Sequence, residues 1–178
     1  QFGGERQRAI TSWINQKIYN QQTSIHWKLF VFLHNLTPTK AFDLGGHKFI
    51  FNYVKLIFSG VLGNYKDFIY KLTLDPSMLN YLNLQLSQKE TPDENYAREV
   101  QELFTVGKRP FSKFTEEDVR GVARSLVGWR FDYEKIIYTE GHEPVIVFQD
   151  WNHDQGDKQF SSFYNNHTIK GKAGQDGR

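Results

Sequence analysis

Four polar side chains fall on one face of a helix predicted over residues 95–106. At about 100° per residue, Asn95, Arg98, Glu99 and Glu102 lie within about 100° of one another, opposite the apolar side chains of the segment. Glu99 and Glu102 are three residues apart and could hold one metal ion or act as an acid and base pair. The simpler interpretation is a solvated face with an i, i+4 ion pair between Arg98 and Glu102. Helix periodicity alone leaves both open.

Two histidines stand where they could take part in chemistry. His34 lies near the end of the most apolar predicted helix, and a hydrogen-bonded core histidine is the simpler alternative to a ligand or a base. His153 and Asp154 are adjacent and could form a metal site or an acid and base dyad. The alternative is a plain turn, in which Asp154 bonds the backbone two residues later. The candidate catalytic residues are Glu99, Glu102, His153 and Asp154.

The motifs of common enzyme classes are absent from the sequence. It has no cysteine, which excludes disulfides, thiolate zinc sites and cysteine nucleophiles. It has no Gly-x-Ser-x-Gly, P-loop, dinucleotide-binding or His-Glu-x-x-His motif, and no Glu-x-x-His of the kind found in di-metal bundles. The sequence therefore predicts no metal site, and it leaves the cofactor unknown and enzymatic activity open.

A basic and aromatic cluster follows the predicted helix over 95–106; it consists of Lys108, Arg109, Phe111, Lys113 and Phe114. Such a mixture occurs in proteins that bind single-stranded nucleic acid. Cations are also favoured at a helix C-terminus, which is the simpler explanation here. With 22 Lys and Arg against 20 Asp and Glu, the net charge of +2 gives no general attraction to nucleic acid or an anionic membrane. We expect no nucleic-acid partner, and any polyanion would need a local patch.

The chain is long enough for one folded domain. Its 178 residues fit the usual domain size of about 100 to 200 residues. Aromatic residues make up 16% of the chain, so we expect a core built on rings. No apolar run reaches the roughly 18 to 20 residues that span a bilayer, and the first residues lack the pattern of a targeting signal.

Apolar residues recur at helical spacing through most of the chain. Helices are predicted over residues 5–19, between Ser24 and Thr37, over Phe49–Ile57, from Asn64 through Leu72, from Pro76 through Leu82, over 95–106 and over 116–127. Ser24 fits an N-cap, and Thr115 with Asp118 fits a capping box. The helix after Ser24 is almost entirely apolar and should therefore be central.

The character of the chain changes after Trp129. The β-branched and aromatic runs Ile136–Tyr138 and Val145–Phe148 predict a small hairpin. We expect the polar remainder to be irregular, with Trp151 and Phe160 as anchors that bring His153 and Asp154 over the helices.

These patterns predict a mainly α fold, a multi-helix orthogonal or bundle-like domain with a small β-hairpin appendage near the C-terminus. The helical body would cover residues 5–128, and the β and irregular segment residues 129–178. Because the glycine-rich end offers no closing element, we expect the single domain of residues 1–178 to be a fragment of a longer one.

Several blocks of the sequence resemble a known family. They are Gly63-Asn64-Tyr65-Lys66-Asp67-Phe68, Asp75-Pro76-Ser77-Met78-Leu79, Glu94-Asn95-Tyr96-Ala97-Arg98-Glu99, Thr115-Glu116-Glu117-Asp118-Val119, Gly128-Trp129 and His153-Asp154 with Gly156 and Lys158. In type and order they are similar to the signatures of the bacterial family called domain of unknown function 1800. The family's Phe-Trp-His-Asn-His-Phe element has one histidine fewer here, around His34, which argues against a multi-histidine metal site.

The resemblance implies an exported bacterial protein, periplasmic or at the cell surface, without an assigned activity. Because the polar face over 95–106 belongs to the family signature, the resemblance also favours a specific role for this face over a merely solvated one. Our first hypothesis is a non-enzymatic binding or scaffold domain, with a buried ion network of Arg98, Glu99, Glu102 and Arg124 and with another exported protein or a glycan as partner. The wider binding or structural set is Asn95, Arg98, Glu99, Glu102, Asp118, Arg124, Trp129, His34 and Lys158. The alternative is a hydrolase-like or metal-binding site of Glu99 and Glu102 with His34 or with His153 and Asp154.

Overall fold

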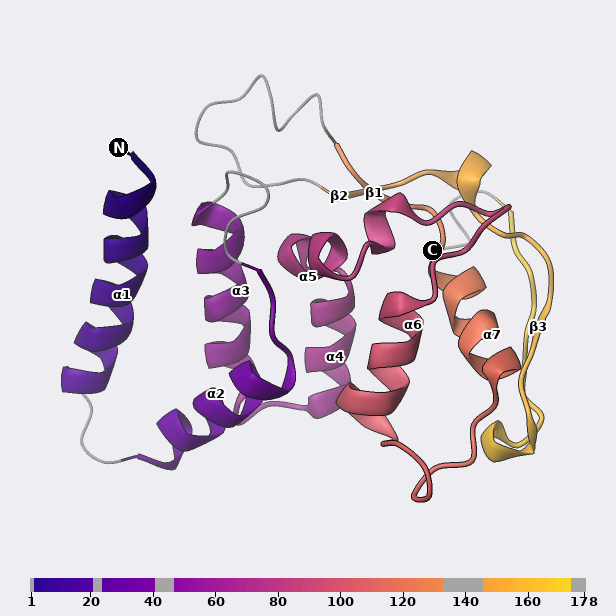
Figure 1. Ribbon diagram of the computed structural model, residues 1–178, viewed down its shortest axis with the longest axis horizontal. Helices are drawn as coiled ribbons and strands as arrows, with labels where there is room; N and C mark the ends of the chain where they lie inside the picture. Colours follow the sequence, from indigo (N-terminus) through magenta and orange to yellow (C-terminus); the bar gives the residue numbers. More distant parts are fainter. Residues whose placement is uncertain (1, 21–23, 41–46, 133–145, 174–178) are drawn as a thin grey trace. The chain divides into compact units, whose positions relative to one another are not determined.

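The computed structural model describes residues 2–20, 24–40, 47–132 and 146–173 (Figure 1). The fold is mainly α, as predicted. The chain divides into two compact units, Gln1–Ser77 and Met78–Arg178. The predicted division between a helical body and a C-terminal segment, at residues 128 and 129, therefore falls inside the second unit. That residues 1–178 make one domain stays a prediction.

The first unit is built around one helix. α1 (Phe2–Asn20), α2 (Ile25–Leu36) and α4 (Tyr65–Thr73) all contact α3 (His47–Gly60). Ser24 caps α2 and Asn64 caps α4, each through a side-chain oxygen that accepts backbone N–H bonds, which confirms both predicted helix starts. The buried core is largely aromatic and aliphatic, with Tyr53, Ile57 and Leu72 almost fully enclosed.

The expectation that α2 is a central helix is wrong. Only Phe30 and Leu33 of α2 are buried, while Val31 and Phe32 are exposed. The helix is apolar on nearly every side, but neighbouring elements cover only one of its faces. Hydropathy measures what a helix could bury, and it does not say how many of its faces have a neighbour.

The second unit begins with short helices and continues with short strands separated by single helical turns. α5 (Pro76–Tyr81) spans the division between the units, and η1 (Leu84–Leu86) follows it. α6 (Asn95–Glu99) continues directly into η2 (Val100–Thr105), and both precede α7 (Glu116–Leu126). β1 (Trp129–Phe131) pairs with β2 (Ile146–Phe148), and after η3 (Asp150–Asn152) the strand β3 (Lys158–Gln159) pairs with β4 (Thr168–Ile169) around η4 (Ser162–Tyr164).

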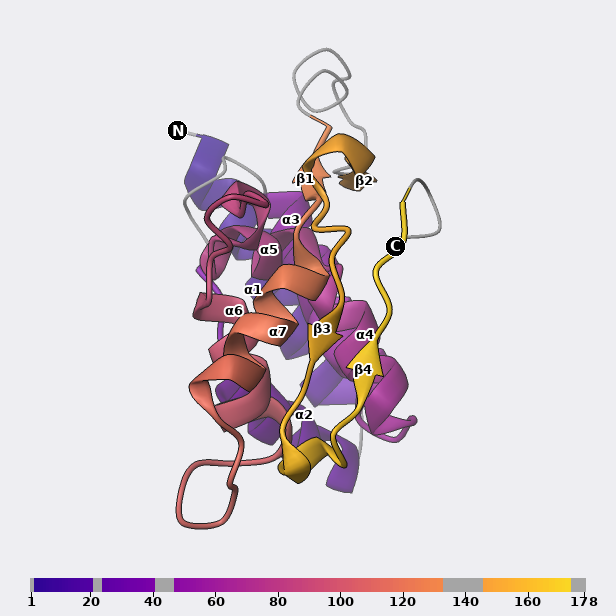
Figure 2. The same cartoon turned by 90° about the vertical axis from the view of Figure 1, so that its right-hand side faces the viewer.

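The two small sheets differ from the predicted hairpin. The segment ending at Phe148 forms a strand as predicted, but its partner is β1, with Trp129 opposite Phe148. The other predicted strand, Ile136–Tyr138, lies outside the described residues. The β3 and β4 pair falls where an irregular segment was expected, and β3 lies along α7 (Figure 2).

The helix predicted over 95–106 is not a uniform α-helix. After Glu99 its backbone changes to π-helical bonding, and both Val106 N and Gly107 N donate to Gln101 O at 3.0 Å. Gly107, at φ +84°, ends the segment in the left-handed region, as predicted. A π turn has more residues per turn than an α turn, so the face drawn at 100° per residue does not hold beyond Glu99.

Candidate functional site

α7 carries two of the sequence-predicted site residues, Asp118 and Arg124. Its N-terminus is fixed by the predicted capping box, in which the Thr115 hydroxyl accepts from Asp118 N at 3.2 Å and the Asp118 carboxylate accepts from Thr115 N at 2.7 Å. Its apolar side buries Val119 and Ala123 against the second unit's core. Asp118 and Arg124, six residues apart, both reach the C-terminal segment. We call the contacts of Asp118 and Arg124 with residues 153–161 the α7 clamp.

Asp118 forms the first half of the α7 clamp. Its side chain is 0% exposed. Besides the capping box, Asp118 Oδ1 accepts from Ser161 N at 2.7 Å and Oδ2 accepts from the Ser161 hydroxyl at 2.6 Å. Burial alone would raise the pKa of Asp118, but the hydrogen bonds from Ser161 and Thr115 outweigh it and hold the pKa below its usual value. Asp118 therefore joins the start of α7 to the β3–β4 hairpin.

Arg124 forms the second half. Arg124 Nε and Nη2 donate to the two carboxylate oxygens of Asp154 at 2.6 and 3.0 Å, a bidentate pair. Lys158, only 2% exposed, donates to the backbone oxygen of Asp154 and lies 3.6 Å from its Oδ1. Asp154 also accepts from Gly156 N at 2.8 Å, which is the turn given as the alternative to a catalytic dyad.

The pKa values of Asp154 and Lys158 are both lowered, but for different reasons. Burial would raise the pKa of Asp154, but the hydrogen bonds from Arg124 and Gly156 and the charges of Arg124 and Lys158 lower it overall. Burial lowers the pKa of Lys158, and the attraction of Asp154 only partly opposes this effect. Asp154 is thus held as a carboxylate between two cations.

His153 is buried and joins the C-terminal segment to Val127, the residue that follows α7. Its Nδ1 lies 2.7 Å from the backbone oxygen of Val127, and its ring packs against Phe148 at 5.2 Å between centroids. His153 and Asp154 therefore lie over the second unit's helices, as expected. Of the two expected anchors, Phe160 is buried against Gly121, but Trp151 is 69% exposed, so its anchoring role was wrong.

Arg98 belongs to a separate ion group. It pairs with Glu94 at 3.0 Å and with Glu116 at 2.7 Å, and it lies 3.9 Å from Glu102. The predicted i, i+4 pair is thus the longest of the three. The hydrogen bonds that Arg98 donates to Glu116 are the main cause that raises the pKa of Arg98, despite partial desolvation. Arg98 and Arg124 therefore stand in different groups, and the expected four-residue network is replaced by two smaller ones.

The two candidate carboxylates do not share one partner. Glu102 pairs with Lys108 at 3.3 Å. Glu99 Oε2 is buried and accepts no hydrogen bond within the described part of the chain. The described residues hold no group of three histidine or acidic side chains that could bind a metal ion.

The remaining candidates lie apart from the α7 clamp. His34 is exposed on α2, beside the rings of Phe30 and Tyr53, so the core-histidine interpretation was wrong. Trp129 packs its ring on Phe148 at 5.2 Å. The backbone N–H of Asn95 donates to Asp93 Oδ1 at 2.8 Å, and the residue is exposed.

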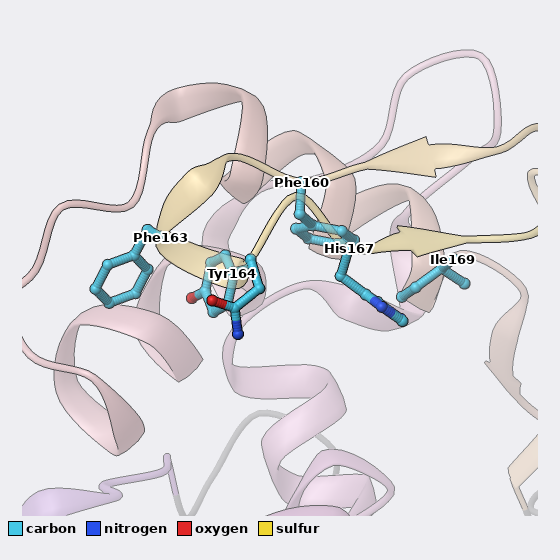
Figure 3. A pocket seen from close by; sticks show the side chains of 6 residues that line it. Phe160, Phe163, Tyr164, His167 and Ile169 are labelled. Carbon is cyan, nitrogen blue, oxygen red and sulfur yellow. The ribbon is translucent and has the colours of Figure 1, made fainter.

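An aromatic pocket on the β3–β4 hairpin was not predicted from the sequence. Its volume is about 380 Å³, and it is lined by Phe160, Phe163, Tyr164, Asn165, His167 and Ile169. Figure 3 shows Phe163 at one end, Ile169 and His167 at the other, and Tyr164 between them. The Tyr164 hydroxyl donates to Gln101 Oε1 at 2.8 Å, and burial raises the pKa of Tyr164 to about 12. The three aromatic residues between 160 and 164 were the signal in the sequence that could have indicated this pocket. The role of Ser161 as a partner of Asp118 was also not predicted.

The described helices include none long and apolar enough to cross a membrane. No curated protein and no solved structure matches the chain. The model of one protein family matches residues 3–178, and that family is described as "Protein of unknown function (DUF1800)". This match covers nearly the whole chain and includes every block that suggested the resemblance. The chain therefore belongs to the DUF1800 family.

Proposed function

We propose that the chain is a non-enzymatic binding domain, in which the α7 clamp holds the β3–β4 hairpin so that its aromatic pocket can receive a glycan. The observation that carries the proposal is the pocket itself, which combines rings with two polar side chains on one short hairpin. Binding pockets are commonly lined by apolar and aromatic groups with a few polar groups that fix orientation.

The lining suits a sugar ring better than a purely apolar ligand. Phe163 and Tyr164 stand edge to face with centroids 4.9 Å apart, and such rings can cover the C–H face of a pyranose. The side chains of Asn165 and His167 make no hydrogen bond with the described residues and can donate to or accept from hydroxyl groups. Sugars offer both kinds of surface.

The charged candidates support a structural role more than a catalytic one. Asp118, Arg124, Asp154 and Lys158 are used in contacts within the chain. A general acid or base needs a proton that it can exchange with substrate, and a bidentate arginine holds the Asp154 carboxylate ionised. A periplasmic or cell-surface location, which we propose on the family resemblance, would give such a domain access to glycans.

A glycan array followed by isothermal titration calorimetry tests the proposal. We expect a saccharide that binds the wild-type chain and loses about tenfold in affinity in the exposed-site variant His167→Ala. Trp151→Ala is the matched control, because Trp151 is an exposed ring outside the pocket and should leave affinity unchanged.

Two results would count against this function. Equal losses in His167→Ala and Trp151→Ala would show that the pocket is not the site. A metal ion retained through purification and lost in Glu99→Gln would favour the hydrolase-like alternative, since Glu99 Oε2 is buried without a partner among the described residues.

A further inference from the structure

The loop between η2 and α7, residues 107–114, is held in a fixed shape with its middle residues outside. The Ser112 hydroxyl donates to Gly107 O, and Phe111 N and Ser112 N both reach Lys108 O, at 3.1 and 3.3 Å. Ser112 is 1% exposed and Phe114 is 7% exposed. The loop extends beyond the ends of α6 and α7 in both views (Figures 1 and 2).

Among the described residues of the second unit, Phe111 has the most exposed ring, at 90%. The turn closed on Lys108 O presents it to solvent while Phe114 points into the core. A phenylalanine that stays in water contributes none of the about 1.5 to 3 kcal/mol that burial would give, so this free energy is available to a partner that covers the ring.

The same loop carries three cations and no acid. Lys108, Arg109 and Lys113 flank the exposed ring in sequence and are themselves exposed. Within the described residues, Arg109 and Lys113 form no ion pair. Lys108 pairs with Glu102 at 3.3 Å, but its side chain is 64% exposed, and such surface pairs are weak.

The acids that flank the loop in sequence each have an ion-pair partner. Glu102 pairs with Lys108, Glu116 with Arg98 and Glu117 with Arg120. Of the loop's three cations, only Lys108 takes part in an ion pair within the described residues, and its own side chain is 64% exposed. An apolar ring among cations complements a surface that has anionic groups in its outer layer and hydrocarbon beneath that layer.

We infer that residues 107–114 form a membrane-docking loop, which inserts Phe111 into the headgroup region of an anionic bilayer while Lys108, Arg109 and Lys113 contact lipid phosphates. Aromatic side chains favour this depth, and each nearby Lys or Arg adds attraction to anionic lipid. A single-stranded nucleic acid fits less well, because stacking sites present successive rings along a groove and Phe114 is buried. This inference does not depend on the glycan pocket.

Vesicle co-sedimentation of the full chain tests the docking loop. We expect binding to vesicles of equal parts phosphatidylcholine and phosphatidylglycerol, and much weaker binding to phosphatidylcholine alone. Phe111→Ser should lower the partition coefficient by about tenfold or more. Arg109→Gln and Lys113→Gln should each lower it by about fivefold, and added salt should weaken binding.

The control is Trp151→Ser, which removes another strongly exposed ring from the described part of the second unit and should leave vesicle binding unchanged. Circular dichroism should show the same fold in every variant, since all the substituted side chains are exposed. Failure of the wild-type chain to bind the anionic vesicles overturns the inference. It is also overturned if Phe111→Ser binds them as tightly as wild type, or if Phe111→Ser weakens binding to an oligothymidylate while vesicles are not bound.

Discussion

Asp154 carries more contacts than any other sequence-predicted catalytic candidate. Its carboxylate lies between Arg124 and the buried Lys158, it accepts the Gly156 N–H, and its own backbone oxygen accepts from Lys158. Removing the negative charge would leave Lys158 buried beside Arg124, with the half-exposed Asp157 as its remaining counter-charge. A buried cation in that state is costly, because the protein interior replaces little of its lost hydration.

We predict that Asp154→Asn lowers the free energy of unfolding by about 2 to 4 kcal/mol at neutral pH. Because the pKa of Asp154 is lowered on folding, its stabilisation is fully present above the unfolded pKa of about 3.9 and is lost as the pH falls through the lowered folded value. The difference between wild type and variant should therefore be constant near neutral pH and narrow below about pH 4. Urea denaturation over a pH series measures both effects.

The matched control for this prediction is Asp157→Asn. Asp157 also pairs with a lysine, Lys170 at 2.6 Å, but both side chains are more than half exposed. The same chemical change three residues away should thus have little effect on stability. Equal destabilisation by the two variants would show that local turn geometry, and not the buried charge group, explains the loss in Asp154→Asn.

At the scale of elements, local signals in the sequence predicted the helix ends well. Ser24, Asn64 and Thr115 mark helix starts because each satisfies backbone N–H groups with its own side chain, and this chemistry is readable within four residues. Gly107 marks the end of its segment for an equally local reason. The partners of Arg98, the pairing of β1 with β2 and the β3–β4 hairpin depend on residues far apart in sequence, so periodicity could not supply them.

The π turn is the clearest case of a face predicted wrongly by periodicity. Helix geometry put Glu99 and Glu102 on one side, but the change to π-helical bonding at Val100 turns the later residues away from that register. Glu102 accordingly meets Lys108, and Gln101 meets the Tyr164 hydroxyl. The partners of Glu102 and Gln101 therefore differ from those that a regular α-helix would give.

Two glycines offer a test of how the elements are joined. Gly107 and Gly128 both have positive φ, +84° and +117°, but a Cβ at Gly107 would meet nothing within 4 Å, whereas at Gly128 it would lie 2.8 Å from the Phe148 ring. We predict that Gly107→Ala costs about 1 kcal/mol from backbone strain alone. Gly128→Ala should cost about 3 kcal/mol, since overlap with Phe148 in β2 adds to the strain.

Thermal and urea unfolding of the two alanine variants, side by side, measures the difference. The larger loss in Gly128→Ala should be partly relieved by Phe148→Leu, which removes the ring edge that the new Cβ would meet. If Phe148→Leu gives no relief, or if both glycine variants lose the same stability, steric contact with β2 is not the cause.

At the scale of the whole chain, each unit has its own set of mutually packed elements. α3 is the centre of the first unit, and α7 is the centre of the second, where it contacts α6 and β3. The α7 clamp lies entirely within the second unit. A substitution in it should therefore open elements of that unit before any others, because local opening follows contiguous groups of contacts.

We predict that Asp118→Asn speeds amide exchange in two segments, α7 and the β3–β4 hairpin, while exchange in α3 stays as in wild type. Asp118 serves both segments at once, since its carboxylate accepts from Thr115 N at the start of α7 and from Ser161 N in the hairpin. An asparagine keeps the size but has one accepting oxygen where the carboxylate has two. Hydrogen exchange followed by mass spectrometry resolves these segments.

The control is Glu117→Gln, which changes an exposed acid in the same turn and should leave exchange in α7, the β3–β4 hairpin and α3 unchanged. Faster exchange in α7 alone would mean that Ser161 holds the hairpin without Asp118, and the α7 clamp would then rest on Arg124 and Asp154.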